Sequence, residues 1–195
     1  MITVLDYGAG NIASVKNVLD ELKIDYLISN REMDICKGDK IIFPGVGEAS
    51  FAIKKLHLMN LFNLLRIIKK PFLGICLGMQ LLAEKSDEGN VTCLGVYPGT
   101  IKKFEDTSLQ VPHMGWNNVN HNSDNKLFHK IKSGELFYFA NSYYMPENEF
   151  QIATSEYGLT FASAMMKNNF YGVQFHPEKS GAPGIQLIKN FIELC

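Results

Sequence analysis

The chain has 195 residues, of which 46% are hydrophobic and 20% are charged, and its formal net charge is -1 at pH 7. This length and composition predict one compact domain, spanning residues 1–195, that buries roughly 70% of the surface of its unfolded chain. The nearly neutral charge gives no electrostatic reason to expect a nucleic acid or an anionic membrane as a partner.

The four cysteines, Cys36, Cys76, Cys93 and Cys195, have no paired short spacing. The sequence therefore predicts neither a zinc site nor a disulfide framework, and we expect no metal and no cofactor. The start of the chain lacks the basic region of a signal peptide. The longest uncharged apolar-rich stretch, Pro71 to Ala83, has 13 residues, whereas a bilayer-spanning helix needs about 20. We expect a cytoplasmic protein, in a reducing compartment that suits a reactive thiol.

The first half of the chain alternates short apolar runs with stretches of helical periodicity. Strands are predicted at Ile2 to Leu5, Tyr26 to Ile28, Ile41 to Phe43 and Pro71 to Ile75. Helices are predicted around Ile12 to Leu22, Ala49 to Leu56, Leu61 to Ile68 and Met79 to Glu84. This β/α succession is typical of a parallel sheet.

After about Val91 the pattern changes to short strands separated by turn residues. These strands are predicted at Leu94 to Thr100, Leu136 to Phe139, Ile152 to Ser155, Phe161 to Met165 and Phe170 to Phe175. They extend the sheet in mixed directions. The polar stretch Asn117 to Asn125 predicts a surface loop. The last helix carries Ile185, Ile188 and Ile192 on one stripe, which we expect to pack on the sheet.

The segment Gly8 to Ala13 fits the G-x-G-x-x-A pattern of a dinucleotide site, between a predicted strand and a predicted helix. The acidic residue that such a site needs is poorly placed, because the second strand ends at Ser29-Asn30 and Glu32 lies beyond an arginine. The pattern therefore favours a tight turn without a cofactor.

Cys76 falls between the predicted strand Pro71 to Ile75 and the predicted helix that begins at Met79, the context of a nucleophile elbow. Gly74 and Gly78 flank it where strand and helix backbones come close. A helix that begins just after the cysteine also favours the thiolate. The alternative is a buried, apolar cysteine, the usual fate of a free one.

His176 and Glu178 are two residues apart at the end of the run Phe170 to Phe175, so an extended chain would point both side chains the same way. Pro177 favours that conformation for His176. A carboxylate that orients an imidazole, which activates a thiol, is the arrangement of a catalytic triad. A hydrogen-bonded histidine at a strand end is the structural alternative, but the elbow and the His-x-Glu segment together favour the triad.

These segments carry a family resemblance. Gly74-Ile75-Cys76-Leu77-Gly78-Met79-Gln80 with Phe175-His176-Pro177-Glu178 resembles the class I, triad-type glutamine amidotransferases. Further motifs in order, namely Tyr7 to Asn11, Phe43 to Gly47, Val111 to Asn117 and His176 to Gly181, resemble the glutaminase subunits of imidazole glycerol phosphate synthases. The resemblance runs from residue 1 to the C-terminus. One departure is Asn141, which stands before Ser142 where the family usually has histidine, and it leaves fine specificity or the acceptor pathway open.

The resemblance implies a three-layer, flavodoxin-like α/β fold with helices on both faces of a mostly parallel or mixed sheet. It also implies the roles of individual residues. The catalytic residues are Cys76, His176 and Glu178. The oxyanion and substrate-binding residues are Gly45, Val46, Gly47, Leu77, Gln80, Glu88 and Ser142, and Asn11 faces a partner.

From the residues alone, several of these positions keep a second interpretation. Pro44 to Gly47 can be a loop that simply needs glycine, Gln80 an exposed helix residue, and Glu88 part of a solvated run. His113 and Trp116 suit a core position and a partner-facing position equally well.

By the resemblance, the chain hydrolyses L-glutamine to L-glutamate and ammonia through a cysteine thioester. The chain is too short to hold a second active domain, so the acceptor chemistry is expected on another polypeptide. In the resembled family that partner is a (β/α)₈ cyclase subunit in a heterodimer. It uses the ammonia to form imidazole glycerol phosphate and an aminoimidazole carboxamide ribotide in L-histidine biosynthesis.

Three other functions stay open at this stage. A paralogue could feed ammonia to a different synthase, such as one that amidates a surface sugar. A cysteine hydrolase of γ-glutamyl peptides would work without a partner. A flavodoxin-like binding module would merely pack Cys76 and would lack catalysis, since a fold alone does not fix a function.

Overall fold

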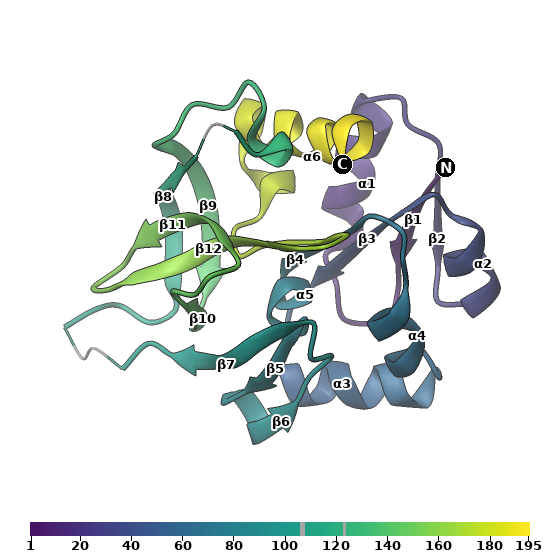
Figure 1. Cartoon of the computed structure of the whole chain (residues 1–195), viewed down its shortest axis with the longest axis horizontal. Coiled ribbons are helices and arrows are strands. Elements are labelled where there is room, and N and C mark those ends of the chain that lie inside the picture. Colours follow the sequence, from purple (N-terminus) through teal and green to yellow (C-terminus); the bar gives the residue numbers. More distant parts are fainter. Residues whose placement is uncertain (106–107, 123) are drawn as a thin grey trace.

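The computed structural model describes residues 1–105, 108–122 and 124–195, and it has three layers with a sheet between two sets of helices (Figure 1). The strands are β1 (Ile2–Leu5), β2 (Tyr26–Ser29), β3 (Lys40–Gly45), β4 (Phe72–Cys76), β5 (Ala83–Ser86), β6 (Val91–Thr92), β7 (Tyr97–Lys103), β8 (His113–His121), β9 (Glu135–Asn141), β10 (Tyr143–Pro146), β11 (Gln151–Glu156), β12 (Thr160–Lys167) and β13 (Phe170–Val173). The α-helices are α1 (Ile12–Glu21), α2 (Glu32–Lys37), α3 (Ala49–Leu58), α4 (Phe62–Ile67), α5 (Leu77–Gln80) and α6 (Gly181–Leu194).

The first part of the sheet is parallel and has the strand order β2-β1-β3-β4-β13. Its central strands are apolar and buried on both faces, as expected for a parallel sheet covered by helices on each side. Helices α1 and α6 cover one face, and α3 and α4 cover the other (Figure 1). The predicted β/α succession is confirmed.

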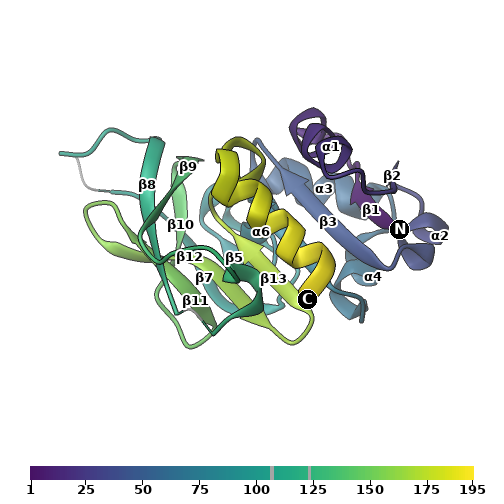
Figure 2. The same cartoon turned by 90° about the horizontal axis from the view of Figure 1, so that it is seen from above.

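The second part of the sheet is mixed, as predicted. Strands β12 and β10 continue from β13, and β7, β5 and β6 follow. Strand β11 pairs with both β12 and β8, and β8 in turn pairs with β9. Figure 2 shows β8 and β9 as a two-stranded ribbon at the end of the molecule opposite β2.

The predicted loop from Asn117 to Asn125 is largely wrong, because Asn117 to His121 belong to β8. Residues His113 to Val119 of this strand pair one by one with β9, and Val119 is buried while Asn118 and Asn120 face solvent. A strand that exposes one face to solvent can be as polar as a loop. Its pairing with a neighbouring strand then decides that the segment is a strand. Ser123 of the predicted loop lies outside the described residues.

The predicted helix from Met79 to Glu84 is also wrong beyond its first turn. Helix α5 ends at Gln80, and Ala83–Ser86 form β5, which pairs with β6 and β7. The residues from Met79 to Ala83 are all buried, which a helix lying against only one surface could not achieve. Helix α2 and strands β5, β6 and β10 were not expected from the sequence.

The glycines on either side of Cys76 have the predicted packing role. A Cβ atom on Gly78 would lie 1.9 Å from the carbonyl oxygen of Phe43 in β3. A Cβ atom on Gly74 would lie 2.7 Å from the backbone of Gly78. The turn after β4 therefore packs directly against β3 and β4, and this contact fixes the position of Cys76.

We predict that Gly78→Ala destabilises the protein by about 1–3 kcal/mol, the usual cost of overpacking a close backbone contact. Gly10→Ala is the matched control, since its Cβ atom would find ordinary contacts at 3.5 Å. Urea unfolding of both variants measures the difference. Equal stability of the two variants would contradict the close contact.

Candidate active site

The carboxyl ends of three neighbouring parallel strands meet around Cys76. Cys76 ends β4, its partner across to β3 is Gly45, and β13 runs alongside with Val173 opposite Ile75. The chain after Val173 therefore enters the same place. Open α/β sheets bind ligands at this edge, where loops leave the strand ends.

The backbone of Cys76 has φ 54° and ψ −111°, a conformation that residues other than glycine rarely adopt. Such strain persists only where packing on all sides enforces it, and it gathers at functional sites. The side chain is only 6% exposed, so the sequence alternative of a buried cysteine is right about burial. A cysteine that only filled the core would need neither the strained turn nor a cavity beside it.

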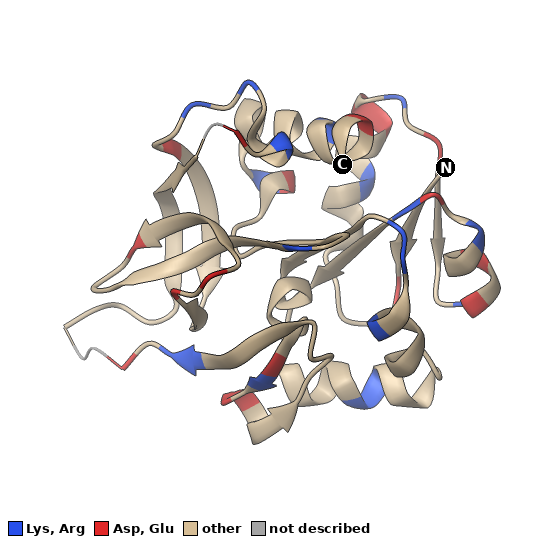
Figure 3. Cartoon of the chain, viewed as in Figure 1, with Lys and Arg blue, Asp and Glu red and all other residues tan. Residues whose placement is uncertain are grey.

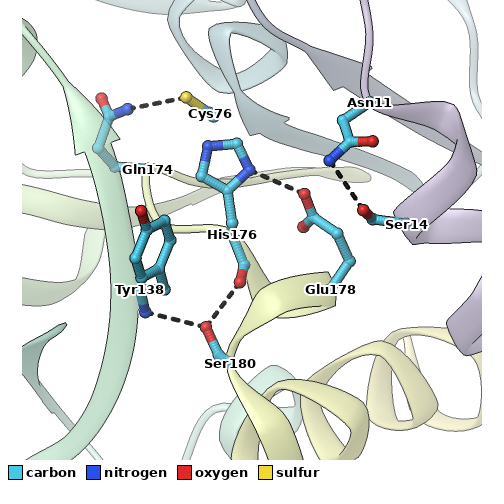
Figure 4. Close-up of polar contacts among 8 residues, drawn as sticks. All are labelled: Asn11, Ser14, Cys76, Tyr138, Gln174, His176, Glu178 and Ser180. Atoms are coloured by element: carbon cyan, nitrogen blue, oxygen red, sulfur yellow. Dashed lines mark hydrogen bonds and ion pairs between the residues drawn. The ribbon is translucent and has the colours of Figure 1, made fainter. Parts of the chain in front are cut away.

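The imidazole Nδ1 of His176 lies 2.8 Å from Oε1 of Glu178, with both side chains at most 2% exposed. The predicted contact is therefore present, and His176 has the predicted extended backbone, but the chain beyond it differs from the prediction. Pro177–Lys179 form a 3₁₀ turn rather than an extended chain, and the turn folds the carboxylate back beneath the ring. Figure 4 shows Cys76 on one side of the imidazole and Glu178 on the other.

The backbone of His176 is anchored to β9. Its amide donates to the carbonyl of Tyr138 at 2.8 Å. The hydroxyl of Ser180 donates to the carbonyl of His176 at 2.6 Å and accepts from the amide of Tyr138 at 3.0 Å (Figure 4). This bridge holds the imidazole against the cysteine.

Burial works against a charged His176, but hydrogen bonds to Cys76 and Glu178 outweigh it and raise the pKa of the imidazole from 6.5 to about 10. The ring is therefore protonated at neutral pH. An imidazolium beside a cysteine sulfur favours the reactive thiolate form. The arrangement can thus supply both a nucleophile and a proton donor.

Cys76 opens into a cavity of about 340 Å³. Of the residues predicted for the site, its lining includes Val46, Gly47, Cys76, Leu77, Gln80, Glu88, Ser142 and His176. It also includes five residues without a predicted role, namely Pro112, Ala140, Asn141, Tyr143 and Lys179. Gly45 and Glu178 stand behind this lining, Gly45 against Tyr7 and Glu178 behind the imidazole.

The lining of the cavity contains two groups of opposite charge, Glu88 and Lys179. Glu88 accepts a hydrogen bond from the amide of Ala49 at 2.8 Å. It is therefore a fixed group and not part of a solvated run. Burial raises the pKa of this carboxyl, so a cationic ligand group beside it would offset the cost of keeping it charged. The pair suits a ligand with an ammonium and a carboxylate.

Gln80 is buried, so the alternative of an exposed helix residue is wrong. Its amide nitrogen donates to the carbonyl of Tyr143 and to Oε1 of Gln174, both at 2.9 Å. Asn141 donates to the same carbonyl of Tyr143 at 2.8 Å. The residue that departs from the family pattern therefore braces the cavity wall.

Sequence reasoning gave no role to Gln174, although its amide nitrogen lies 3.7 Å from Sγ of Cys76 (Figure 4). The signal for it was an amide in an otherwise apolar run that ends at the histidine. Lys179 was also missed, because a lysine after the triad segment is indistinguishable in sequence from a solvated surface residue.

Asn11 lies outside the cavity. It precedes α1, and its side chain donates to the hydroxyl of Ser14 at 2.8 Å, on the far side of Glu178 from the cysteine (Figure 4). The nearby turn is closed by the carboxylate of Asp6, which accepts from the amide of Gly8 at 3.1 Å.

Within the described ranges, no cluster of three or more histidine, cysteine or carboxylate side chains could hold a metal ion. None of the helices in those ranges is long and apolar enough to cross a membrane. Lys and Arg are spread along the described chain among Asp and Glu (Figure 3).

The sequence profile of the family Glutamine amidotransferase class-I matches residues 3–194. The chain is 47% identical over 190 residues to the imidazole glycerol phosphate synthase subunit HisH of Mannheimia succiniciproducens, covering 97% of this chain and 98% of that one. It is 44% identical over 194 residues to the subunit HisH of Escherichia coli K12, with 99% of each chain covered.

Two solved structures share the fold. A structure titled as a glutamine amidotransferase superposes with a TM-score of 0.76 at 16% identity, over 98% of this chain and 97% of that chain. A glutamine amidotransferase from Thermotoga maritima superposes with a TM-score of 0.65 at 21% identity, over 98% of this chain and 80% of that chain. The expected three-layer amidotransferase fold is confirmed.

The raised pKa of His176 predicts a pH dependence of stability. The folded protein holds the proton more tightly than the unfolded chain, whose histidine titrates near 6.5. The stabilisation is therefore complete below about pH 6.5 and is lost as the pH rises through about 10.

We expect the difference in unfolding free energy between wild type and His176→Gln to shrink over that range, as measured by denaturant titration. The exposed His129, changed to glutamine, is the control and should show no such trend. A wild-type advantage that stays constant across the range would contradict the raised pKa.

Proposed function

The chain belongs to the class-I glutamine amidotransferases, and we propose that within this family it is the glutaminase subunit of an imidazole glycerol phosphate synthase. The observation that carries the activity is the contact of the Cys76 turn with the buried His176–Glu178 pair, at the edge of a cavity of amino-acid size. The relatives that are 44–47% identical to this chain over nearly its whole length are named as that subunit.

In the first half-reaction, the thiolate of Cys76 attacks the side-chain amide carbon of L-glutamine. Negative charge develops on the amide oxygen, and the backbone amides of the Gly45-Val46-Gly47 segment and of Leu77 are the proposed donors to it. One such donor lowers a barrier by about 3 kcal/mol. His176 gives its proton to the leaving nitrogen, so ammonia departs and a glutamyl thioester remains.

In the second half-reaction, His176 is neutral after giving up its proton and can accept one from water. The resulting hydroxide attacks the thioester, releases L-glutamate and restores the thiolate and the imidazolium. Glu178 holds Nδ1 throughout, which fixes the tautomer and the orientation of the ring. One residue thus serves both steps.

The cavity supports glutamine as the substrate. In this proposal Glu88 receives the α-ammonium group and Lys179 the α-carboxylate, since both side chains line the cavity. Both N–H groups of Gln80 are used inside the protein, so its Oε1 is left as an acceptor for the ligand. Ser142 completes the wall, and no metal or cofactor is needed for this chemistry.

An exposed apolar surface beside the cavity supports a protein partner. Met114, Trp116 and Leu136 are 47–64% exposed on one face of the β8–β9 ribbon. In the ribbon Met114 lies opposite Ala140, which lines the cavity. An apolar patch of this kind marks an interaction site. His113, in contrast, is a core residue stacked between Phe139 and Tyr157.

We infer that this ribbon faces the cyclase subunit in a heterodimer, and that Asn11 lies towards the same partner. Free ammonia would be mostly protonated in neutral water, so the partner must take it up through a closed passage. There it serves the formation of imidazole glycerol phosphate in L-histidine biosynthesis. Residues 1–195 act in this proposal as one glutaminase domain in the cytoplasm, where the catalytic thiol stays reduced.

Glutamate release tests the activity directly. The chain mixed with its candidate cyclase subunit should release glutamate from glutamine much faster when the ribotide acceptor is present. Cys76→Ala should lower that rate by about 10⁴-fold or more, while Cys36→Ala, at an exposed thiol, should not. Cys76-dependent release that ignores this cyclase would redirect the search to another synthase, and no release would refute the activity.

The partner surface has a separate test. Trp116→Ala should weaken binding of the cyclase subunit by about tenfold, because a central exposed aromatic side chain is a typical interface anchor. Phe51→Ala is the matched control, since Phe51 is similarly exposed on α3. Calorimetric titration measures both affinities. Equal affinities for the two variants would place the partner elsewhere.

A further inference from the structure

A chain of buried amides connects the wall of the cavity to the sulfur of Cys76. It begins at the carbonyl of Tyr143, which accepts from Gln80 at 2.9 Å. Gln80 donates its other N–H to Oε1 of Gln174 at 2.9 Å, and Gln174 donates to Sγ of Cys76 at 3.7 Å. Gln174 and Gln80 are 0% and 4% exposed, so water does not compete for these bonds.

The direction of this chain is fixed by its first member. A backbone carbonyl can only accept, so the atom of Gln80 that faces Tyr143 must be the NH₂ group. Its second N–H then requires an oxygen from Gln174, and the NH₂ group of Gln174 is left facing the sulfur. The carbonyl of Tyr143 thereby ensures that Cys76 receives a donor and not an acceptor.

We propose that Gln174 is a further functional residue of this glutaminase, which stabilises the thiolate of Cys76 by a hydrogen bond and orients it towards the cavity. This inference rests on the proposed function for its purpose, but the hydrogen bond itself does not. A donor to the sulfur favours its charged form over its neutral form. Gln80 acts one step further back, by holding the amide of Gln174 in orientation.

The one-turn length of α5 gives this donor its importance. A longer helix after Cys76 was expected from the sequence to favour the thiolate, but α5 has four residues. A single turn sums few peptide dipoles, so its field at the sulfur is weaker than that of a full helix. An oriented side-chain amide supplies a partial positive charge in its place.

The other titratable groups around Cys76 come from three directions. His176 follows β13, and its raised pKa makes it a positive group in contact with Cys76 at neutral pH. The hydroxyl of Tyr7, which follows β1, is buried near the sulfur without a hydrogen-bond partner among the described residues. Glu88 and Lys179 are further charged side chains in the lining of the cavity. A test must therefore change Gln174 and leave these groups in place.

The test measures the alkylation rate of Cys76 by iodoacetamide against pH, read by peptide mass spectrometry in the full chain. Gln174→Met keeps the length of the side chain and removes the donor. We expect the midpoint of the Cys76 profile to move up by about one pH unit, so that alkylation slows about tenfold at pH values well below the midpoint. The exposed Cys36 in the same sample is the internal reference and should not change.

Gln186→Met is the control, because it makes the same exchange on α6, at a position away from the sulfur. Gln80→Met should move the profile in the same direction by a smaller amount. If Gln174→Met fails to fold, Gln174→Glu keeps the shape and should suppress alkylation near neutral pH, because a carboxylate repels the thiolate.

An unchanged Cys76 profile in folded Gln174→Met would overturn the inference. Alkylation needs neither glutamine nor a partner, so the two proposals fail separately. A chain that shows the predicted shift but hydrolyses no glutamine would refute only the proposed function. A glutaminase whose profile ignores Gln174 would refute only this inference.

Discussion

The structure depends on the parallel pairing of β3, β4 and β13 in a register that brings Gly45, Cys76 and Gln174 to one edge of the sheet. Close backbone packing enforces this arrangement, because Gly78 lies against the carbonyl of Phe43 with no room for a side chain. The same packing holds Cys76 at a positive φ that it would not adopt alone. Core packing thus sustains the local strain that presents the sulfur.

Burial and hydrogen bonding act in opposite directions on the charged groups at this edge of the sheet. It disfavours the charged imidazole of His176, yet the fixed contacts with Cys76 and Glu178 outweigh that cost and keep the ring protonated. A buried pair of this kind needs hydrogen bonds that offset the cost of taking its charges out of water. Ser180 supplies the backbone bonds that hold the histidine, and Gln174 supplies a bond to the sulfur. The amide chain also links the nucleophile to Gln80, which lines the cavity.

The sequence predicted the parallel half of the fold and most of the residues that meet at the cavity, because buried apolar runs and short motifs depend on local order. Cys76, His176 and Glu178 do come together, although the 3₁₀ turn at Pro177 replaces the expected extended chain. Long-range pairing was harder to predict. The polar strand β8 and the short strand β5 exist only through their partners, and neither has a distinctive local pattern. Gln174 was missed for the same reason, since its importance comes from a neighbour nearly a hundred residues away.

The proposed glutaminase reaction requires a covalent bond between Cys76 and the substrate. Rapid acid quenching of the chain during turnover of glutamine with its partner, followed by peptide mass spectrometry, tests it most directly. We expect a glutamyl adduct on the peptide that contains Cys76, and none on the peptides with Cys36, Cys93 or Cys195. Steady glutamate release without any adduct on Cys76 would contradict it.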